Sequence, residues 1–152
     1  PLRHGDVCAS ALNIARTLAL TPQDLCLNVM PLLHSHGLIS ALLSSISVGA
    51  SVYCMPGFNA MKFFGWLDEV KPTWYSAEAT MHQAILSRAQ TNAEILHRHT
   101  LRLIRSSSTA LPPQLLNELQ DTFGLPVIES HDEIPAGPAG KIRPIAKLGS
   151  TS

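Results

Sequence analysis

Residues 101–129, LRLIRSSSTALPPQLLNELQDTFGLPVIE, contain one complete strand–helix–strand unit. The run at 101–106 is typical of a strand, Pro112-Pro113 opens a helix, and Gly124 ends that helix before a second strand at 127–129. Two strands joined through one helix lie parallel in the same sheet, with a right-handed crossover. This unit therefore predicts an α/β fold.

The same alternation fills the chain before residue 101. Strands are expected at 25–30, 51–55 and 73–76, and helices at 6–18, 37–48, 60–70 and 80–90, with Asp6 as the cap of the first helix. Five strands alternating with helices predict an α/β domain with a mainly parallel sheet and helices on both faces. Ligands of such folds gather at the carboxyl ends of the strands, and we expect the functional residues there.

The composition indicates one globular domain without strong charge. The 152 residues are 45% hydrophobic, and 11 basic residues balance 11 acidic ones. Nucleic acid and anionic membrane surfaces are therefore not expected partners, and the longest apolar run, residues 38–48, is too short for a membrane span. Small molecules or proteins are the expected partners.

The cysteines Cys8, Cys26 and Cys54 are odd in number and lack the spacing of a zinc or redox site. We interpret them as three buried free thiols in a reducing compartment, which favours the cytoplasm. Residues 146–148 are similar to a peroxisomal signal, but such signals act at the extreme C-terminus and Ser152 lies beyond them.

Two histidines follow the first predicted strand, in the segment PLLHSHGL at residues 31–38. His34 or His36 could hydrogen-bond an anionic ligand near the amino end of the next helix. The structural alternative is a histidine that is satisfied by backbone groups at the end of a strand. A metal site is disfavoured, because no Cys, Asp or Glu lies nearby to complete the ligand set.

A hydroxyl-rich segment, residues 105–113, follows the fourth predicted strand and leads into a helix. Its small residues let a ligand approach the backbone, whose amides could cradle a phosphate or a flat ring. A serine-rich turn that caps the helix fits the same residues equally well. The segment alone leaves both interpretations open.

Proline and glycine interrupt regular structure after Ser130, so residues 131–152 are expected to form a mostly irregular tail. The segment GPAGKI at 137–142 is not a P-loop, because the first glycine of that motif is missing and Ile142 replaces its hydroxyl residue. Lys141 is then either a solvated lysine or a positioned cation for a carboxylate or phosphate.

Together, these segments resemble the adenylate-forming (AMP-binding) superfamily in its acyl-CoA synthetase branch, and most of all the oxalate–CoA ligase type. Residues 31–38 look like P-L-F-H-x-H-G-L, and residues 105–111 resemble R-S-x-S-A-x-L. Residues 74–83 resemble W-Y-x-A-V-P-T-x-H-Q, although Glu78 and Ala79 replace the valine and the proline. Residues 135–142 resemble the family's C-terminal P-x-x-x-x-G-K-I segment.

The resemblance implies that residues 1–130 are part of the large-domain core of that fold and that residues 131–152 are a tail with the lysine segment. It implies a catalytic role for Lys141 and no metal-ligating residue. It also implies contacts to the substrate or the adenylate for a further set of residues: His34, Ser106, Ser107, Ser108, Thr109, Ala110 and Leu111.

By the same resemblance, the activity is ATP-dependent ligation of a small carboxylic acid to coenzyme A through an acyl-adenylate, with ATP, Mg²⁺ and coenzyme A as cofactors. The family's phosphate loop and ribose-binding motif are not found in these 152 residues, and residues 131–133 stand where its Y-G-M-T-E motif is expected. We therefore expect an internally truncated ligase with negligible activity on its own. The alternative is a non-catalytic module that binds a carboxylic acid or pairs with a full-length ligase. The expected location is the cytoplasm, or the peroxisome for an intact parent.

Overall fold

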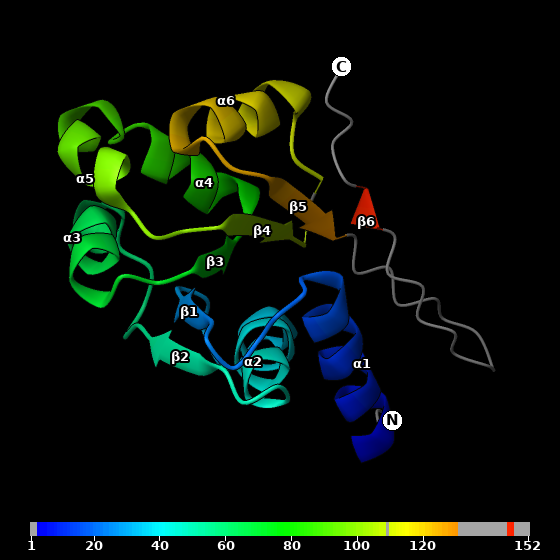
Figure 1. The fold of residues 1–152 in the computed structure, drawn as a ribbon. Helices are drawn as coiled ribbons and strands as arrows, with labels where there is room; N and C mark the ends of the chain where they lie inside the picture. Colours follow the sequence, from blue (N-terminus) through cyan, green and yellow to red (C-terminus); the bar gives the residue numbers. More distant parts are fainter. Residues whose placement is uncertain (1–2, 109, 131–145, 148–152) are drawn as a thin grey trace.

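The computed structural model describes residues 3–108, 110–130 and 146–147 (Figure 1). The helices are α1 (His4–Thr17), η1 (His36–Leu43), α2 (Ser44–Ile46), α3 (Ala60–Val70), α4 (Ala79–Leu86), η2 (Gln90–Asn92), α5 (Ala93–Arg98) and α6 (Pro113–Phe123). The strands are β1 (Leu25–Asn28), β2 (Ser51–Cys54), β3 (Trp74–Ala77), β4 (Leu103–Ser107), β5 (Val127–Ser130) and β6 (Ala146–Lys147).

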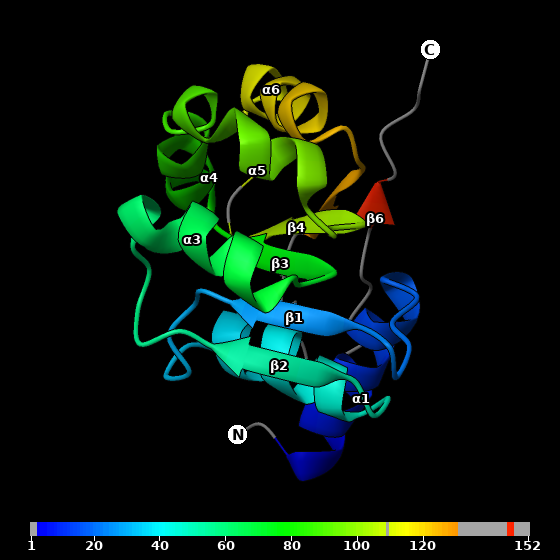
Figure 2. The same ribbon diagram turned by 60° about the vertical axis from the view of Figure 1, so that its left-hand side comes forward.

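One sheet with the strand order β2-β1-β3-β4-β5-β6 forms the centre of the fold. Strands β1 to β5 pair in parallel, and α1, η1 and α2 cover one face while α3 to α6 cover the other (Figure 2). The predicted α/β fold with a mainly parallel sheet and helices on both faces is therefore confirmed. Residues 146–147, which we expected to be irregular, instead form a two-residue strand antiparallel to β5.

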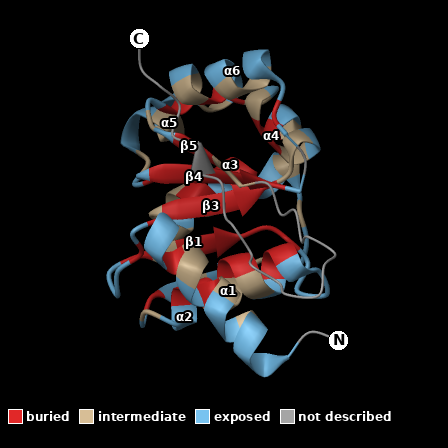
Figure 3. Ribbon diagram, turned by 90° about the vertical axis from the view of Figure 1, so that its right-hand side faces the viewer, coloured by how far each residue is buried: buried red, intermediate tan, exposed pale blue. Residues whose placement is uncertain are grey.

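The central strands are buried on both faces because successive side chains point to opposite sides of the sheet. Leu27, Tyr75 and Ile104 enter the core beneath α3 to α6, where α3 contributes Phe63. Their neighbours Cys26, Trp74 and Leu103 enter a second core together with Leu18, which follows α1. Figure 3 shows β3 and β4 buried along their length. The edge strand β2, by contrast, is mostly exposed.

Three local expectations were wrong. Asp6 is not the cap of α1, because the helix begins at His4 and the Asp6 carboxylate instead accepts the backbone N–H of Arg3 at 3.1 Å. Cys8 and Cys54 are exposed, and only Cys26 is buried. The helix predicted at 80–90 ends at Leu86, and α5 was not predicted because its six residues include no fully buried side chain.

Asp24 ties the amino ends of the strands together. This buried carboxylate receives Arg102 through Nε at 2.7 Å and Nη2 at 2.8 Å, and the Thr73 hydroxyl at 2.7 Å. Thr73 also accepts the backbone N–H of Leu25 at 2.9 Å, so the contact joins the starts of β1, β3 and β4. Although burial alone would raise the pKa of Asp24, hydrogen bonds from Arg102, Thr73 and Thr21 hold it well below its usual value.

Within the part of the chain that the structure describes, no helix combines the length and the apolar character needed to cross a bilayer.

Candidate functional site

The strand order reverses its direction between β1 and β3. The chain passes from β1 outward to β2 and then crosses back to β3, so the connections on the two sides of this point leave in opposite directions. In open parallel sheets, such a reversal opens a crevice outside the carboxyl ends of the strands, where ligands bind. The segment after β1 holds His34 and His36, and β3 ends at Ala77.

A row of polar side chains crosses the sheet near this point. Asn28 pairs with Ser76 on the neighbouring strand, and Ser76 pairs in turn with Arg105. Because each residue follows Cys26, Trp74 or Leu103 by two positions, all three face the side of the sheet that is covered by α1 and η1. They are 1%, 0% and 1% exposed, which is unusual for polar side chains in neighbouring central strands.

His36 lies against this row as the first residue of η1 and is 3% exposed. Its Nε2 is 2.6 Å from Ser76 Oγ, and Arg105 donates through Nη1 to the same hydroxyl at 3.2 Å. Its Nδ1 makes a longer contact, 3.4 Å, with Ser108 Oγ. The result is a continuous polar chain from Arg105 through Ser76 and His36 to the loop after β4.

The backbone around His36 is fixed by a close approach at Gly37. A Cβ at this position would overlap the carbonyl oxygen of Pro31 and lie 2.8 Å from its carbonyl carbon and 2.9 Å from the carbonyl oxygen of Met30. Only glycine therefore allows the segment after β1 to lie against η1. This helix is a π-helix, a form that often occurs at functional sites, and not the α-helix expected from the sequence.

Burial keeps the imidazole of His36 neutral. Desolvation, followed by the nearby charge of Arg105 and by His82, lowers the pKa of His36 from 6.5 to about 3. Burial likewise lowers the pKa of His82 to about 4, opposed by backbone hydrogen bonding at Ala77 and Arg105. His82 Nδ1 lies 3.1 Å from the hydroxyl of Tyr75, whose pKa burial raises. At neutral pH the charge of this region therefore comes from Arg105.

The residues predicted to bind substrate or adenylate occupy different places. His34 is exposed, and its backbone N–H donates to the carbonyl of Pro31 at 3.2 Å. Ser106 and Ser107 are buried inside β4, and not in the loop that follows it. Ser108 and Ala110 are exposed, with Ser108 in the left-handed region at a φ of 80°, and Leu111 is buried in the core. Thr109 and Lys141 lie outside the described residues.

The structure thus brings Ser108 together with His36, which was one of the two candidate histidines, and with Ser76 and Arg105, which were not predicted as site residues. Arg105 carried a usable signal, because a charged residue stood inside a run that was predicted to be a buried strand. Ser76 offered none, since a serine at the end of a strand is common. His36 was one of two histidines, and spacing alone does not show which of them turns inward.

The described residues do not fit a Mg²⁺ ion. Among them, no group of three His, Cys, Asp or Glu side chains could hold a metal. Asp24 and Asp68, which have the strongly lowered carboxyl pKa values in this part of the chain, are both bonded to arginines. We therefore assign no step through a metal to these residues.

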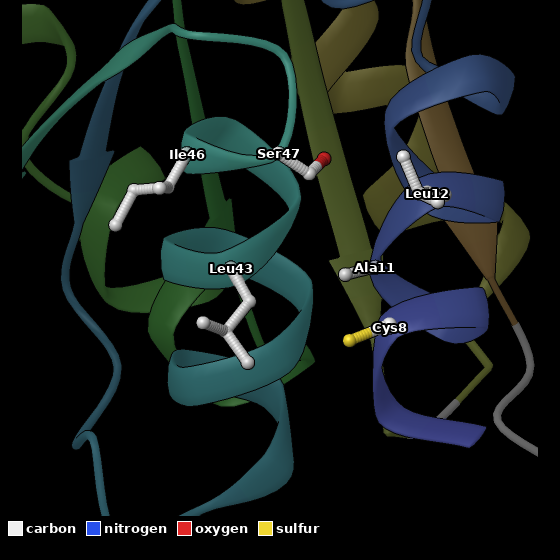
Figure 4. Close-up of a pocket in the computed structure, with 6 residues that line it drawn as sticks. All are labelled: Cys8, Ala11, Leu12, Leu43, Ile46 and Ser47. Atoms are coloured by element: carbon white, nitrogen blue, oxygen red, sulfur yellow. The ribbon is translucent and has the colours of Figure 1, made fainter. Parts of the chain in front are cut away.

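A second hollow, of about 360 Å³, lies between α1 and the η1–α2 segment (Figure 4). Its lining is almost entirely apolar and contains no charged side chain: Cys8, Ala11, Leu12, Leu43, Ile46 and Ser47. It shares no residue with the polar chain around His36. It offers nothing that would recognise an anion, and the carboxyl end of the sheet is therefore the candidate site.

Comparison with known proteins places this geometry among the AMP-binding enzymes, whose family description matches residues 1–131. An oxalate–CoA ligase of Arabidopsis thaliana is 39% identical over 134 residues, which cover 86% of this chain and 26% of that protein. An oxalate–CoA ligase of Saccharomyces cerevisiae is 37% identical over 131 residues, with 86% and 23% coverage. The crystal structure of the anthranilate CoA ligase AuaEII with anthranoyl-AMP superposes with a TM-score of 0.75 at 26% identity, over 86% of this chain and 26% of that one. The chain spans about a quarter of the length of these proteins.

Proposed function

The chain belongs to the AMP-binding enzyme family, and from this premise we propose that it forms the acid-binding part of a ligase that joins a small carboxylic acid to coenzyme A. The predicted resemblance to oxalate–CoA ligases agrees with the two relatives described above. Because the chain corresponds to about a quarter of their length, the complete reaction is a proposal about the whole protein.

The reaction that the family implies has two transfers. The carboxylate of the acid first attacks the α-phosphate of ATP, which forms an acyl-adenylate and releases pyrophosphate. The thiol of coenzyme A then attacks the acyl carbon and releases AMP. Sequence that matches the family's phosphate loop and ribose-binding motif is not present in these 152 residues. We therefore propose that this chain alone binds the acid without completing either transfer.

The observation that carries the proposal is the buried guanidinium of Arg105 in β4, hydrogen-bonded to Ser76 near the carboxyl ends of the strands. An arginine held in a water-poor site can form two parallel hydrogen bonds to a carboxylate, and such charge-assisted bonds are stronger than those between neutral groups. The buried hydroxyl of Ser76 and amide of Asn28 lie in the same row and supply further polar groups. Oxalate carries two carboxylates, so one can bind at Arg105 while the other remains available for reaction.

The earlier site residues keep the roles that the resemblance gives them, as proposals. His34 and residues 106–111 would face the adenylate, and Lys141 would contact the carboxylate and phosphate from the tail. Ser108 has additional support, because its hydroxyl contacts His36.

The proposal is tested by titrating oxalate and acetate separately into the 152-residue chain and following the Arg105 side-chain signals by NMR. Oxalate is expected to bind more tightly than acetate, and Arg105→Gln to weaken oxalate binding about tenfold or more, because a charge-assisted bond is lost. Lys62→Ala, at an exposed site on α3, is the control and should bind as the unsubstituted chain does. If oxalate does not bind, or if Arg105→Gln binds it unchanged, the proposed function is wrong.

Pyrophosphate exchange separates a ligase from a binding module. The chain with ATP, Mg²⁺ and oxalate is expected to give no ATP–pyrophosphate exchange above background. Exchange that depends on oxalate would show that the chain forms the adenylate unaided, against our proposal. Pairing with a full-length oxalate–CoA ligase is checked separately, by whether the two proteins co-elute on gel filtration.

A further inference from the structure

The hydrogen bonds around His36 restrict which of its ring nitrogens carries the proton. Arginine is only a donor, so Ser76 Oγ accepts from Arg105 Nη1 at 3.2 Å. The short contact of 2.6 Å between Ser76 Oγ and His36 Nε2 therefore holds either the hydroxyl proton of Ser76 or a ring proton of His36. A neutral imidazole carries its single N–H proton on one of the two ring nitrogens, so two arrangements are possible.

With the ring proton on Nε2, His36 would donate to Ser76, whose own hydroxyl proton would then need another acceptor. The described contacts of Ser76 Oγ provide none. With the ring proton on Nδ1, Ser76 donates to Nε2, and Nδ1 donates to Ser108 Oγ at 3.4 Å. This second arrangement gives an acceptor both to the hydroxyl proton of Ser76 and to the ring proton of His36, and it also points the Ser76 hydroxyl proton away from the positive charge of Arg105.

We propose that His36 is a positioning residue of the acid-binding site: with its ring proton on Nδ1, it fixes the Ser76 hydroxyl that orients Arg105 and at the same time holds Ser108. This inference rests on the proposed function, because it deepens the description of the same site. His36 does not touch the acid in this arrangement. It acts through Ser76 on Arg105 and through Nδ1 on Ser108.

The arrangement has a direct consequence for the loop after β4. When Ser108 Oγ accepts from His36, its hydroxyl proton has no acceptor among the contacts of the described residues and is proposed to be donated to a ligand. Ser108 is exposed and adopts a φ of 80°, a backbone conformation that non-glycine residues rarely occupy. The acid-binding site then has two oriented donors, the guanidinium of Arg105 and the hydroxyl of Ser108.

Two substitutions separate the two contacts of His36. A glutamine amide reaches the position of Nε2 and can accept from Ser76, whereas an asparagine amide reaches the position of Nδ1 and can contact only Ser108. We expect His36→Gln to bind oxalate within about threefold of the unsubstituted chain. His36→Asn should weaken binding about tenfold, the effect of one lost hydrogen bond of typical strength. If His36 had only a structural role, both variants would weaken oxalate binding to the same extent, apart from any difference in their stability.

The tautomer is measured on the unsubstituted chain, which avoids any variant that fails to fold. Long-range ¹H–¹⁵N correlation at pH 7 is expected to show the proton of His36 on Nδ1, and a proton on Nε2 would overturn the inference. Oxalate binding by the unsubstituted chain together with equal binding by both His36 variants would also overturn it, while leaving the proposed function intact. Absence of oxalate binding by the unsubstituted chain would overturn the proposed function itself.

Discussion

The two ends of the sheet use arginine in different ways, although both arginines come from one short stretch of chain. At the amino end, Arg102 donates two hydrogen bonds to the carboxylate of Asp24, and the Thr73 hydroxyl donates a third. At the carboxyl end, three residues further on, Arg105 donates to the hydroxyl of Ser76, which is bonded to a neutral imidazole. The first arrangement pairs opposite charges within the fold, and the second joins a guanidinium to a hydroxyl and a neutral imidazole.

This difference indicates that the two ends of the sheet have different roles, one in stability and the other in binding. A buried carboxylate that is paired and hydrogen-bonded stabilises the native state relative to any state in which one partner is missing. A guanidinium near the carboxyl ends of parallel strands can form charge-assisted hydrogen bonds to an anion, at the edge of the sheet where ligands of such folds bind. We therefore expect substitutions at the amino end to change stability, and those at the carboxyl end to change binding.

The largest loss of stability is expected from Asp24→Ala. It removes the acceptor of Arg102 and of Thr73 together and should cost about 2 to 3 kcal/mol, less than for a fully buried pair because the Arg102 side chain is 39% exposed. Asp68→Ala is the matched control, because Asp68 is also bonded to two basic residues but on the surface, where ion pairs contribute little. Urea denaturation measures the free energy of unfolding of both variants. If both lost the same amount, the proposal that the contacts at the amino end of the sheet stabilise the fold would be contradicted.

Gly37→Ala is expected to cost about 2 kcal/mol, because the new Cβ would overlap the backbone of Pro31 and force the segment after β1 away from η1. Gly65→Ala, on α3, has nothing within 4 Å of the new Cβ and should stabilise the protein by up to about 1 kcal/mol. The Gly37 variant should also weaken oxalate binding, since it moves His36. A stable Gly37→Ala variant with normal binding would show that the close approach is not needed.

The two ends are expected to lose stability in different pH ranges. The pKa of His36 falls from 6.5 to about 3 on folding, so the unfolded chain binds a proton there that the native state lacks. Stability is then complete above pH 6.5 and falls by up to about 1.4 kcal/mol per pH unit below it, with His82 acting in the same direction. The lowered pKa of Asp24 means that its contribution is lost only below its ordinary pKa of 3.8.

Urea denaturation between pH 7 and pH 4 measures this difference. His36→Gln should remove about half of the decline across this range, because it leaves the contribution of His82 in place. Asp24→Asn should lower the free energy of unfolding at every pH in this range and leave its dependence on pH unchanged. Identical slopes for the unsubstituted chain and His36→Gln would mean that His36 is not buried as a neutral group.

The sequence was sufficient for the order of strands and helices, because apolar runs alternated with amphipathic segments and Gly124 marked a helix end that the structure confirms. It was insufficient for the site, because the decisive facts are contacts between distant segments. Asn28, Ser76 and Arg105 become neighbours only through the register of three strands. Likewise, His36 is buried as the first residue of η1, and the π-helical winding of η1 is not indicated by the 3.6-residue pattern.

A moderate change in stability is expected from a substitution with a large effect on binding. Ser76→Ala removes one buried hydroxyl that bonds both His36 and Arg105, and it should cost about 1 to 2 kcal/mol. Oxalate binding should fall about tenfold, because Arg105 and His36 lose the group that joins them.

Thr73→Val, just before the same strand, removes the hydroxyl that bonds Asp24 at the amino end and keeps the side-chain shape. It should cost about as much stability as Ser76→Ala, because each of the two hydroxyls bonds a charged side chain, yet it should leave oxalate binding unchanged. Two hydroxyls three residues apart would then separate stability from binding. If Thr73→Val weakened oxalate binding as strongly as Ser76→Ala, the two ends would not act independently, and the loss at Ser76 would reflect general destabilisation of the sheet.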